Sequence, residues 1–218
     1  MSFNVKSIVK ETRNLPPRIV LLGTEKVGKS TFVSQIPNVT ILPVKGETGL
    51  DKLLCHKFPV AQTYDDVMEA ITSLAMDEHE HKFFGLDSTS TFERLVWEHT
   101  CKCEGWSHIE KPGYGKGYTV SLSHWQRILD GLDYLREVRG MGIILTGHVK
   151  TSLFNDPQFE PYDTFVWDVK ENAANLMMRW ADCILFARPK LFIKQVGEGF
   201  RFISEHFIFI HGIYLSCA

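Results

Sequence analysis

Residues 18–31 read Arg-Ile-Val-Leu-Leu-Gly-Thr-Glu-Lys-Val-Gly-Lys-Ser-Thr, and this stretch decides the fold. Its first part is an apolar run that ends at a glycine, which is typical of a short buried β-strand. Its second part matches the pattern G-x-x-x-x-G-K-[ST], in which a glycine-rich loop surrounds a phosphate with backbone N–H groups. Residues 28–36 can then open a helix whose positive end is aimed at the same place.

The predicted phosphate-binding loop assigns a run of adjacent residues to nucleotide binding: Gly23, Thr24, Glu25, Lys26, Val27, Gly28, Lys29, Ser30 and Thr31. We expect Lys29 to neutralise the β- and γ-phosphates and to take part in catalysis, and the Ser30 hydroxyl to hold Mg²⁺. A glycine-rich turn with a solvated lysine is the alternative interpretation. The strand before the motif and the helix after it favour the phosphate site.

Strands and helices alternate along the rest of the chain. Short apolar runs predict strands at 39–44, 83–87, 143–146 and 183–186, and helical spacing predicts helices at 63–75, 90–101, 120–138 and 172–180. Loops are expected at 105–118 and 148–163. This alternation predicts an α/β fold of a single domain, in which helices cover both faces of a mostly parallel sheet.

Polar residues at strand ends are the next site candidates, because ligands of parallel sheets lie at the carboxyl ends of the strands. Asp87 ends one predicted strand, and it either reaches Mg²⁺ through water or caps the helix that follows. Glu47 follows the strand at 39–44, and it either activates an attacking water or is a solvated loop acid. His148 follows the strand at 143–146, and it either senses the γ-phosphate or has no function.

The charge balance, the cysteines and the lengths of the apolar runs limit the partners and the location of the protein. The 218 residues carry 24 Lys+Arg and 26 Asp+Glu, a net charge of −2, which counts against nucleic-acid binding through bulk positive charge. The five cysteines and the absence of an apolar leader predict reduced thiols in a cytoplasm. No run of about 18 apolar residues is present, so no association with a membrane is expected.

Two local clusters allow more than one interpretation. His99, Cys101, Cys103 and His108 are soft ligands that zinc prefers, but their spacing is unlike that of common zinc motifs, which favours an ordinary helix end. The loop near Trp106–Tyr118 mixes aromatic and basic residues. It either stacks on single-stranded DNA or packs against a neighbouring subunit.

The order of these motifs resembles a known family. The segments are GTEKVGKST, GETGLDKL, FFGLDSTSTFE, PGYGKGY, GIILTGH and YDTFVWDVKENAANLMMRWAD. Over roughly residues 17–188 the chain resembles phage nucleotide-binding proteins that have a RecA-like P-loop ATPase core and are linked to recombination and single-strand annealing.

This resemblance implies an activity and a set of roles. It implies hydrolysis of ATP, stimulated by DNA, with Mg²⁺ held by Ser30 and Asp87, Glu47 as the catalytic glutamate and His148 as the sensor. It also implies a homo-oligomer, a ring or a filament, with ATP at subunit interfaces. A phage annealing protein or single-strand binding protein is an implied partner, and the cytoplasm of an infected host is the implied location. The family often carries an arginine where this chain has Thr164, which leaves Lys170 as the nearest candidate for a cation acting on the neighbouring subunit.

Two rival functions and a division of the chain complete the predictions. A P-loop small-molecule kinase is one rival, although an arginine-rich lid is absent between Arg139 and Arg179. A nucleotide-binding interaction module without significant turnover is the other. We expect an N-terminal segment at 1–16, the ATPase core at 17–190 and an atypical hydrophobic strand or tail at 191–218.

Overall fold

The computed structural model describes residues 4–5, 8–10, 12–188, 190–196, 199–205 and 211–213. In chain order the elements are β1 (Arg18–Gly23), α1 (Lys29–Ser34), β2 (Val39–Pro43), β3 (His56–Lys57), α2 (Tyr64–Met76), β4 (Phe83–Asp87), α3 (Thr89–Glu104), α4 (Lys116–Val138), β5 (Gly142–Phe154), β6 (Tyr162–Trp167), α5 (Glu171–Trp180), β7 (Cys183–Ala187), β8 (Lys190–Val196), β9 (Gly199–Glu205) and β10 (His211–Ile213).

The main sheet has the strand order β10-β7-β1-β5-β4-β2-β3, and β6 pairs with β5 outside this path. The five pairings from β7 to β3 are parallel, whereas β10 and β6 run antiparallel to their neighbours. The register aligns Gly23 with His148 and Pro43 with Asp87, so the carboxyl ends of the strands meet at one edge. The phosphate-binding loop leaves this edge between β1 and α1.

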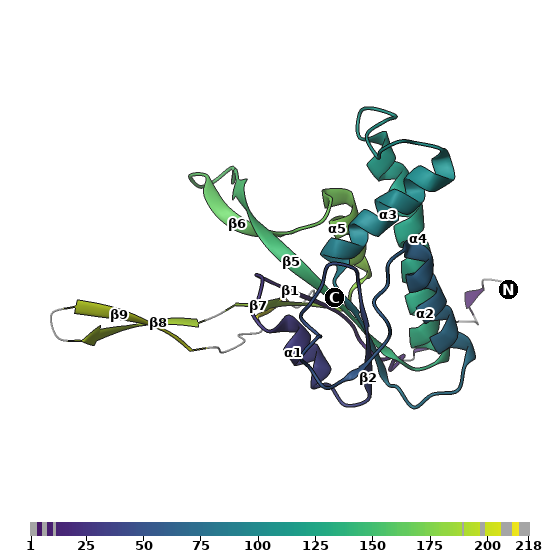
Figure 1. Cartoon of the computed structure of the whole chain (residues 1–218), viewed down its shortest axis with the longest axis horizontal. Coiled ribbons are helices and arrows are strands. Elements are labelled where there is room, and N and C mark those ends of the chain that lie inside the picture. Colours follow the sequence, from purple (N-terminus) through teal and green to yellow (C-terminus); the bar gives the residue numbers. More distant parts are fainter. Residues whose placement is uncertain are drawn as a thin grey trace.

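The helices are divided unequally between the two faces of the sheet. Helices α2, α3, α4 and α5 cover one face, and α1 lies apart from them on the other (Figure 1). The larger core combines the four helices with β1, β2, β4 and β5, and the smaller core joins Val33 of α1 to Leu21, Ile41 and Ile144. The predicted α/β fold, with helices on both faces of a mostly parallel sheet, is therefore confirmed.

Local sequence signals explain where the helices begin and end. Thr63 accepts a hydrogen bond from the backbone N–H of Asp66, whose side chain accepts one in return, so α2 begins with an N-cap of a residue type that favours this position. Helix α4 ends at Val138, and Gly140 with a φ of 66° stops it.

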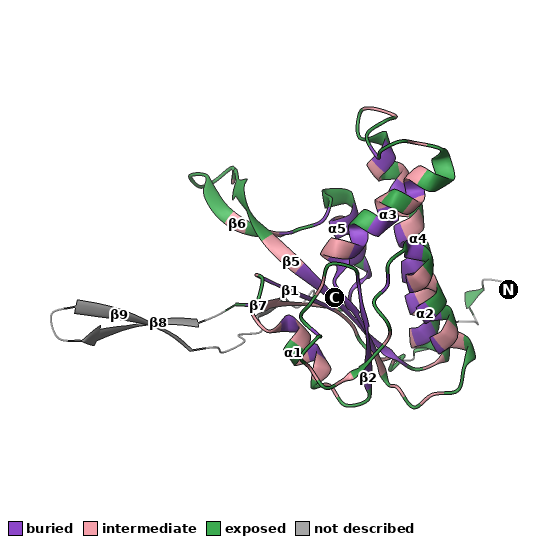
Figure 2. Cartoon of the chain, viewed as in Figure 1, coloured by how far each residue is buried: buried purple, intermediate pink, exposed green. Residues whose placement is uncertain are grey.

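The expected loop at 148–163 is wrong over most of its length. Strand β5 continues to Phe154 and pairs with β6, from Val149 opposite Trp167 to Phe154 opposite Tyr162. Figure 2 shows that this ribbon is mostly exposed, which explains the error. Away from their base at Val149 and Trp167, its strands are held by pairing with each other and not by burial, so no regular apolar alternation marks them in the sequence.

The expected glycine-rich loop is also shorter than predicted. Helix α4 begins at Lys116, so the loop spans residues 105–115 and Tyr118 belongs to the first turns of the helix. The change matters for the site, because Tyr118 packs edge-on against Trp97, with 5.1 Å between ring centroids, and is not a loop side chain.

The remaining expectations concern the termini and the thiols. Cys55, Cys101, Cys103 and Cys183 are free thiols, and Cys217 lies outside the described residues. Within the expected tail, β8 and β9 form a separate antiparallel pair and β10 extends the main sheet, while 197–198, 206–210 and 214–218 lie outside the described residues. No helix in the described part of the chain is both long and apolar enough to cross a membrane.

Candidate functional site

The phosphate-binding loop is shaped around Lys29, which is 5% exposed. Gly28 adopts a φ of 98°, a conformation that favours glycine, and the chain turns there into α1. The Lys29 ammonium donates to the carbonyls of Gly23 (2.9 Å) and Thr24 (2.8 Å) and lies 3.3 Å from Nδ1 of His148. Burial lowers the pKa of Lys29, and the charges of Asp87, Glu47 and Glu25 oppose that effect.

The Ser30 hydroxyl lies against the end of β4. It donates to Oδ2 of Asp87 at 2.7 Å, and the Thr146 hydroxyl donates to Oδ1 of the same carboxylate at 2.6 Å. Asp87 is 3% exposed, so these contacts fix its orientation. A hydroxyl and a carboxylate side by side provide the oxygen donors that Mg²⁺ prefers, and the site therefore fits this ion.

Glu47 follows β2 and is held by two partners. Its Oε1 accepts a hydrogen bond from the Ser88 hydroxyl at 2.6 Å and lies 3.0 Å from Nε2 of His148. Burial acts to raise the pKa of Glu47, but the hydrogen bonds to His148 and Ser88 outweigh it and hold the pKa below its usual value. The carboxylate is therefore ionised at neutral pH, which is the form that a general base needs.

The neighbours of His148 define its tautomer. The Lys29 ammonium has only N–H donors, so Nδ1 of His148 must accept, and Nε2 then carries the proton that it donates to Glu47. The backbone N–H of His148 donates to the Ser90 hydroxyl at 3.0 Å. One imidazole thus connects the lysine of the loop to the carboxylate beyond β2.

The structure brings together all of the residues that the sequence singled out at the strand ends. Lys29, His148 and Glu47 form one chain of contacts, and Ser30 contacts Asp87, whose charge acts on Lys29. Their catalytic and metal-binding roles remain predictions. Within one chain the Lys170 ammonium lies 4.3 Å from the centroid of the Tyr118 ring, and its action on a neighbouring subunit stays a prediction.

Sequence reasoning missed the hydroxyl groups that orient these residues. Ser88, Ser90 and Thr146 contact Glu47, His148 and Asp87, and Thr89 accepts from the indole N–H of Trp167 at 3.2 Å. The run Ser-Thr-Ser directly after the strand acid was the available signal. Its meaning depends on which neighbouring strand each hydroxyl faces, and a single sequence does not give this.

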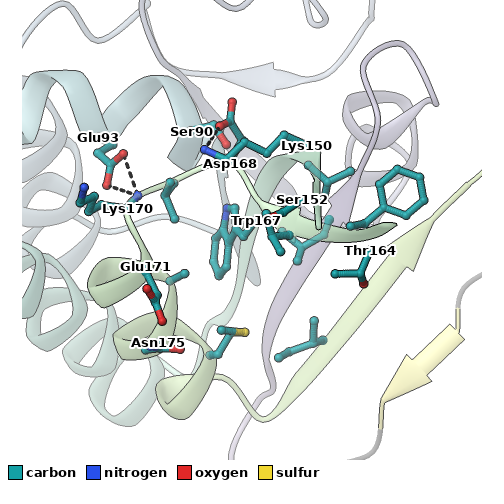
Figure 3. A pocket seen from close by; sticks show the side chains of 18 of the residues that line it. Ser90, Glu93, Lys150, Ser152, Thr164, Trp167, Asp168, Lys170, Glu171 and Asn175 are labelled. Atoms are coloured by element: carbon teal, nitrogen blue, oxygen red, sulfur yellow. Dashed lines mark hydrogen bonds and ion pairs between the residues drawn. The ribbon is translucent and has the colours of Figure 1, made fainter. Parts of the chain in front are cut away.

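A cavity of about 1130 Å³ lies beside the network, between α3, α5, β7 and the β5–β6 ribbon. Figure 3 shows Glu93 and Lys170 at one side of it and Ser152 and Thr164 at the other. Both Glu93 carboxylate oxygens accept the backbone N–H of Lys170, at 2.8 and 3.0 Å. Burial raises the pKa of Glu93 to about 7, although this N–H acts in the opposite direction. Ser90 lines the cavity and connects it to His148.

The phosphate-binding loop follows β1, an inner strand of a mostly parallel sheet, and a buried acid ends another strand. These features define a P-loop nucleotide-binding protein of the ATPase class. A family model described as an AAA domain matches residues 15–206, and the chain belongs to this family. No curated protein matches the sequence. Among solved structures, the chain is similar to the crystal structure of the RadB recombinase, with a TM-score of 0.47 and 13% identity over 82% of this chain and 80% of that one.

Proposed function

We propose that the chain binds ATP with Mg²⁺ at residues 23–31 and hydrolyses the ATP to ADP and phosphate. The observation that carries the proposal is the contact network around Lys29, in which groups from the ends of β1, β2, β4 and β5 converge. Such convergence is what phosphoryl transfer requires, because its catalysis consists mainly of positioning and charge stabilisation.

Lys29 and the metal-side residues would bind the triphosphate. All three N–H donors of the ammonium are occupied, and the contact with His148 at 3.3 Å is the longest of them. We expect a phosphate oxygen to replace this contact first. Ser30 and Asp87 would hold Mg²⁺, which when bound neutralises charge on the β- and γ-phosphates.

Glu47 would act as the general base. A water bound to its carboxylate would attack the γ-phosphorus, Glu47 would take a proton from that water, and the bond to the bridging oxygen would break so that ADP leaves with the electron pair. Ser88 and His148 would keep the carboxylate in position. His148 also contacts Lys29, so a γ-phosphate that binds Lys29 would change the contacts of His148 and thereby act on Glu47.

Phosphate-release and ATP-binding assays on three variants test the hydrolytic part. Glu47→Gln should retain ATP binding and lose about 10²–10⁴-fold in turnover, the usual contribution of a general base. Lys29→Ala should lose both binding and turnover. Glu69→Gln, which changes an exposed acid on α2, is the matched control and should behave as wild type. Wild-type turnover in Glu47→Gln would remove Glu47 from the role of base.

We also propose that single-stranded DNA stimulates hydrolysis and is contacted by the loop at 105–115. Tyr114 at the tip of this loop is fully exposed, and it lies between Gly113 and Gly115 in a run of three residues with positive φ that turns the chain back. Lys111 and Lys116 flank it with exposed side chains. An exposed ring between two cations is suited to stacking on bases while phosphates are neutralised.

Turnover measured with single-stranded, duplex and no DNA tests this part. Single-stranded DNA should stimulate wild type the most, and Tyr114→Ala should lose most of the stimulation and keep the basal rate. Tyr134→Ala, which removes an exposed tyrosine of α4, is the control. Equal stimulation in wild type and Tyr114→Ala would show that the loop ring does not contact DNA.

The biological setting proposed here follows from the resemblance of the motifs. The protein would act in phage DNA recombination or single-strand annealing in the cytoplasm of the infected host, together with a phage annealing or single-strand binding protein. It would assemble into a ring or filament with ATP at the interfaces between subunits. Mass measurement of the protein with ATP and with ADP tests the assembly, and a monomer under both conditions would contradict it.

A further inference from the structure

Three histidine and cysteine side chains converge where the last turns of α3 pack against α4. His99 and Cys103 lie one turn apart on α3 and therefore share a face of that helix, and His124 comes from α4. One nitrogen or sulfur atom from each of them lies within 4.8 Å of the other two. The Cys103 sulfur is 3.5 Å from Nε2 of His99, and the two imidazole rings meet edge to face with 4.7 Å between centroids.

The surroundings hold both imidazoles in place. The Tyr64 ring stacks on His99 with 4.1 Å between centroids, and the Tyr64 hydroxyl donates to the backbone carbonyl of His124 at 3.1 Å. Asp65 approaches the other side of His99, with its Oδ1 3.6 Å from Nδ1. In metal sites a ligating histidine often has a carboxylate beside the ring nitrogen that does not bind the ion, and Asp65 lies on that side of His99.

We propose that His99, Cys103 and His124 bind a zinc ion. Zinc accepts thiolate and imidazole ligands in a tetrahedron, and its bond lengths place a sulfur and a nitrogen of one tetrahedron about 3.5 Å apart. The separation between Cys103 and His99 agrees with this value. Cys103 is exposed, so an ion can enter from solvent, and water would take the fourth position.

This ligand set differs from the cluster that is visible in the sequence. Cys101 lies on α3 only two residues from Cys103, and His108 lies in the loop at 105–115, and neither belongs to the converging group. His124 belongs to it because α4 packs against α3. The ion would join the last turn of α3 to α4 and thereby fix the base of the loop between them. The site is separate from the phosphate-binding loop and does not depend on the proposed hydrolysis.

Cobalt titration of the full-length protein, first stripped of metal with a chelator, tests the proposal. Co²⁺ should bind with one equivalent per chain and give the intense visible bands of a tetrahedral site and a near-ultraviolet thiolate band, and Zn²⁺ should remove both. Cys103→Ser should lose the thiolate band, and His124→Gln should weaken Co²⁺ binding by at least about 10-fold, the lower end of what even residues around a metal site contribute.

Two controls and a second measurement keep the result interpretable. Cys101→Ser and His108→Ala should bind Co²⁺ as wild type does. Zn²⁺ should raise the melting temperature of wild type and of both controls, and it should leave Cys103→Ser unchanged. Circular dichroism checks that each variant is folded. Absence of Co²⁺ binding in wild type, or loss of the thiolate band in Cys101→Ser with its retention in Cys103→Ser, would overturn the assignment.

Discussion

Replacing Glu93 with glutamine should change how the stability of the protein depends on pH. Glu93 is 5% exposed, and burial raises its pKa from the ordinary 4.5 to about 7. Between pH 4.5 and about 7, Glu93 therefore holds a proton in the folded state that it has already lost in the unfolded chain. The stabilisation from this proton is complete below pH 4.5 and is lost as the pH rises toward 7.

The size of the effect follows from the two pKa values. One proton bound differently in the two states changes the free energy of unfolding by about 1.4 kcal/mol per pH unit between them. Wild type should therefore lose about 2.5 kcal/mol more than Glu93→Gln between pH 5 and pH 8. Glutamine is similar in shape to the protonated acid, and its carbonyl can still accept the Lys170 N–H.

Urea unfolding of the two proteins at pH 5, 6, 7 and 8 measures this difference, because other titrating groups contribute equally to both. Glu171→Gln, which changes an exposed acid in the first turn of α5, is the matched control and should follow wild type. Parallel pH profiles for wild type and Glu93→Gln would show that the Glu93 carboxyl is ionised in the folded protein and would refute the reasoning.

Three further substitutions have expected outcomes. In Gly49→Ala the added methyl would lie 2.6 Å from the Ser30 hydroxyl, so ATP turnover should fall at least about 10-fold. Full turnover in this variant would show that hydrolysis does not depend on the position of the Ser30 hydroxyl. Trp125→Ala empties a site that is 1% exposed and should cost about 3–5 kcal/mol in urea unfolding, whereas a loss below about 1 kcal/mol would contradict its place in the core. Thr63→Ala removes the cap of α2 and should cost about 1 kcal/mol, so an unchanged urea midpoint would show that the capping bond adds no stability.

The elements that the sequence predicts correctly are those with local signals. The apolar run before Gly23, the cap at Thr63 and the stop at Gly140 each act within a few residues, and the structure has an element boundary at each of them. Pro43 is a related case. It lacks an N–H for the ladder, which favours a strand end, and β2 ends at this residue.

The features that the sequence does not predict depend on pairing between distant segments. The outer half of β5 is largely exposed and has no regular apolar alternation, and its pairing with β6 is what makes it a strand. The partners of Glu47 and Asp87, namely Ser88 and Thr146, follow from the register of neighbouring strands. The approach of His124 to Cys103 likewise follows from helix packing, which no spacing rule along the chain contains.

The position of β5 between β1 and β4 also affects the order in which the protein can assemble during synthesis. Strand β1 pairs only with β5 and β7, among the residues that the structure describes, and both follow residue 141. A nascent chain that has not reached Gly142 therefore has the apolar strand β1 without a neighbour, while β2, β3 and β4 already have partners. Chaperones that bind exposed apolar segments should accordingly recognise this ribosome-bound intermediate through residues 18–23.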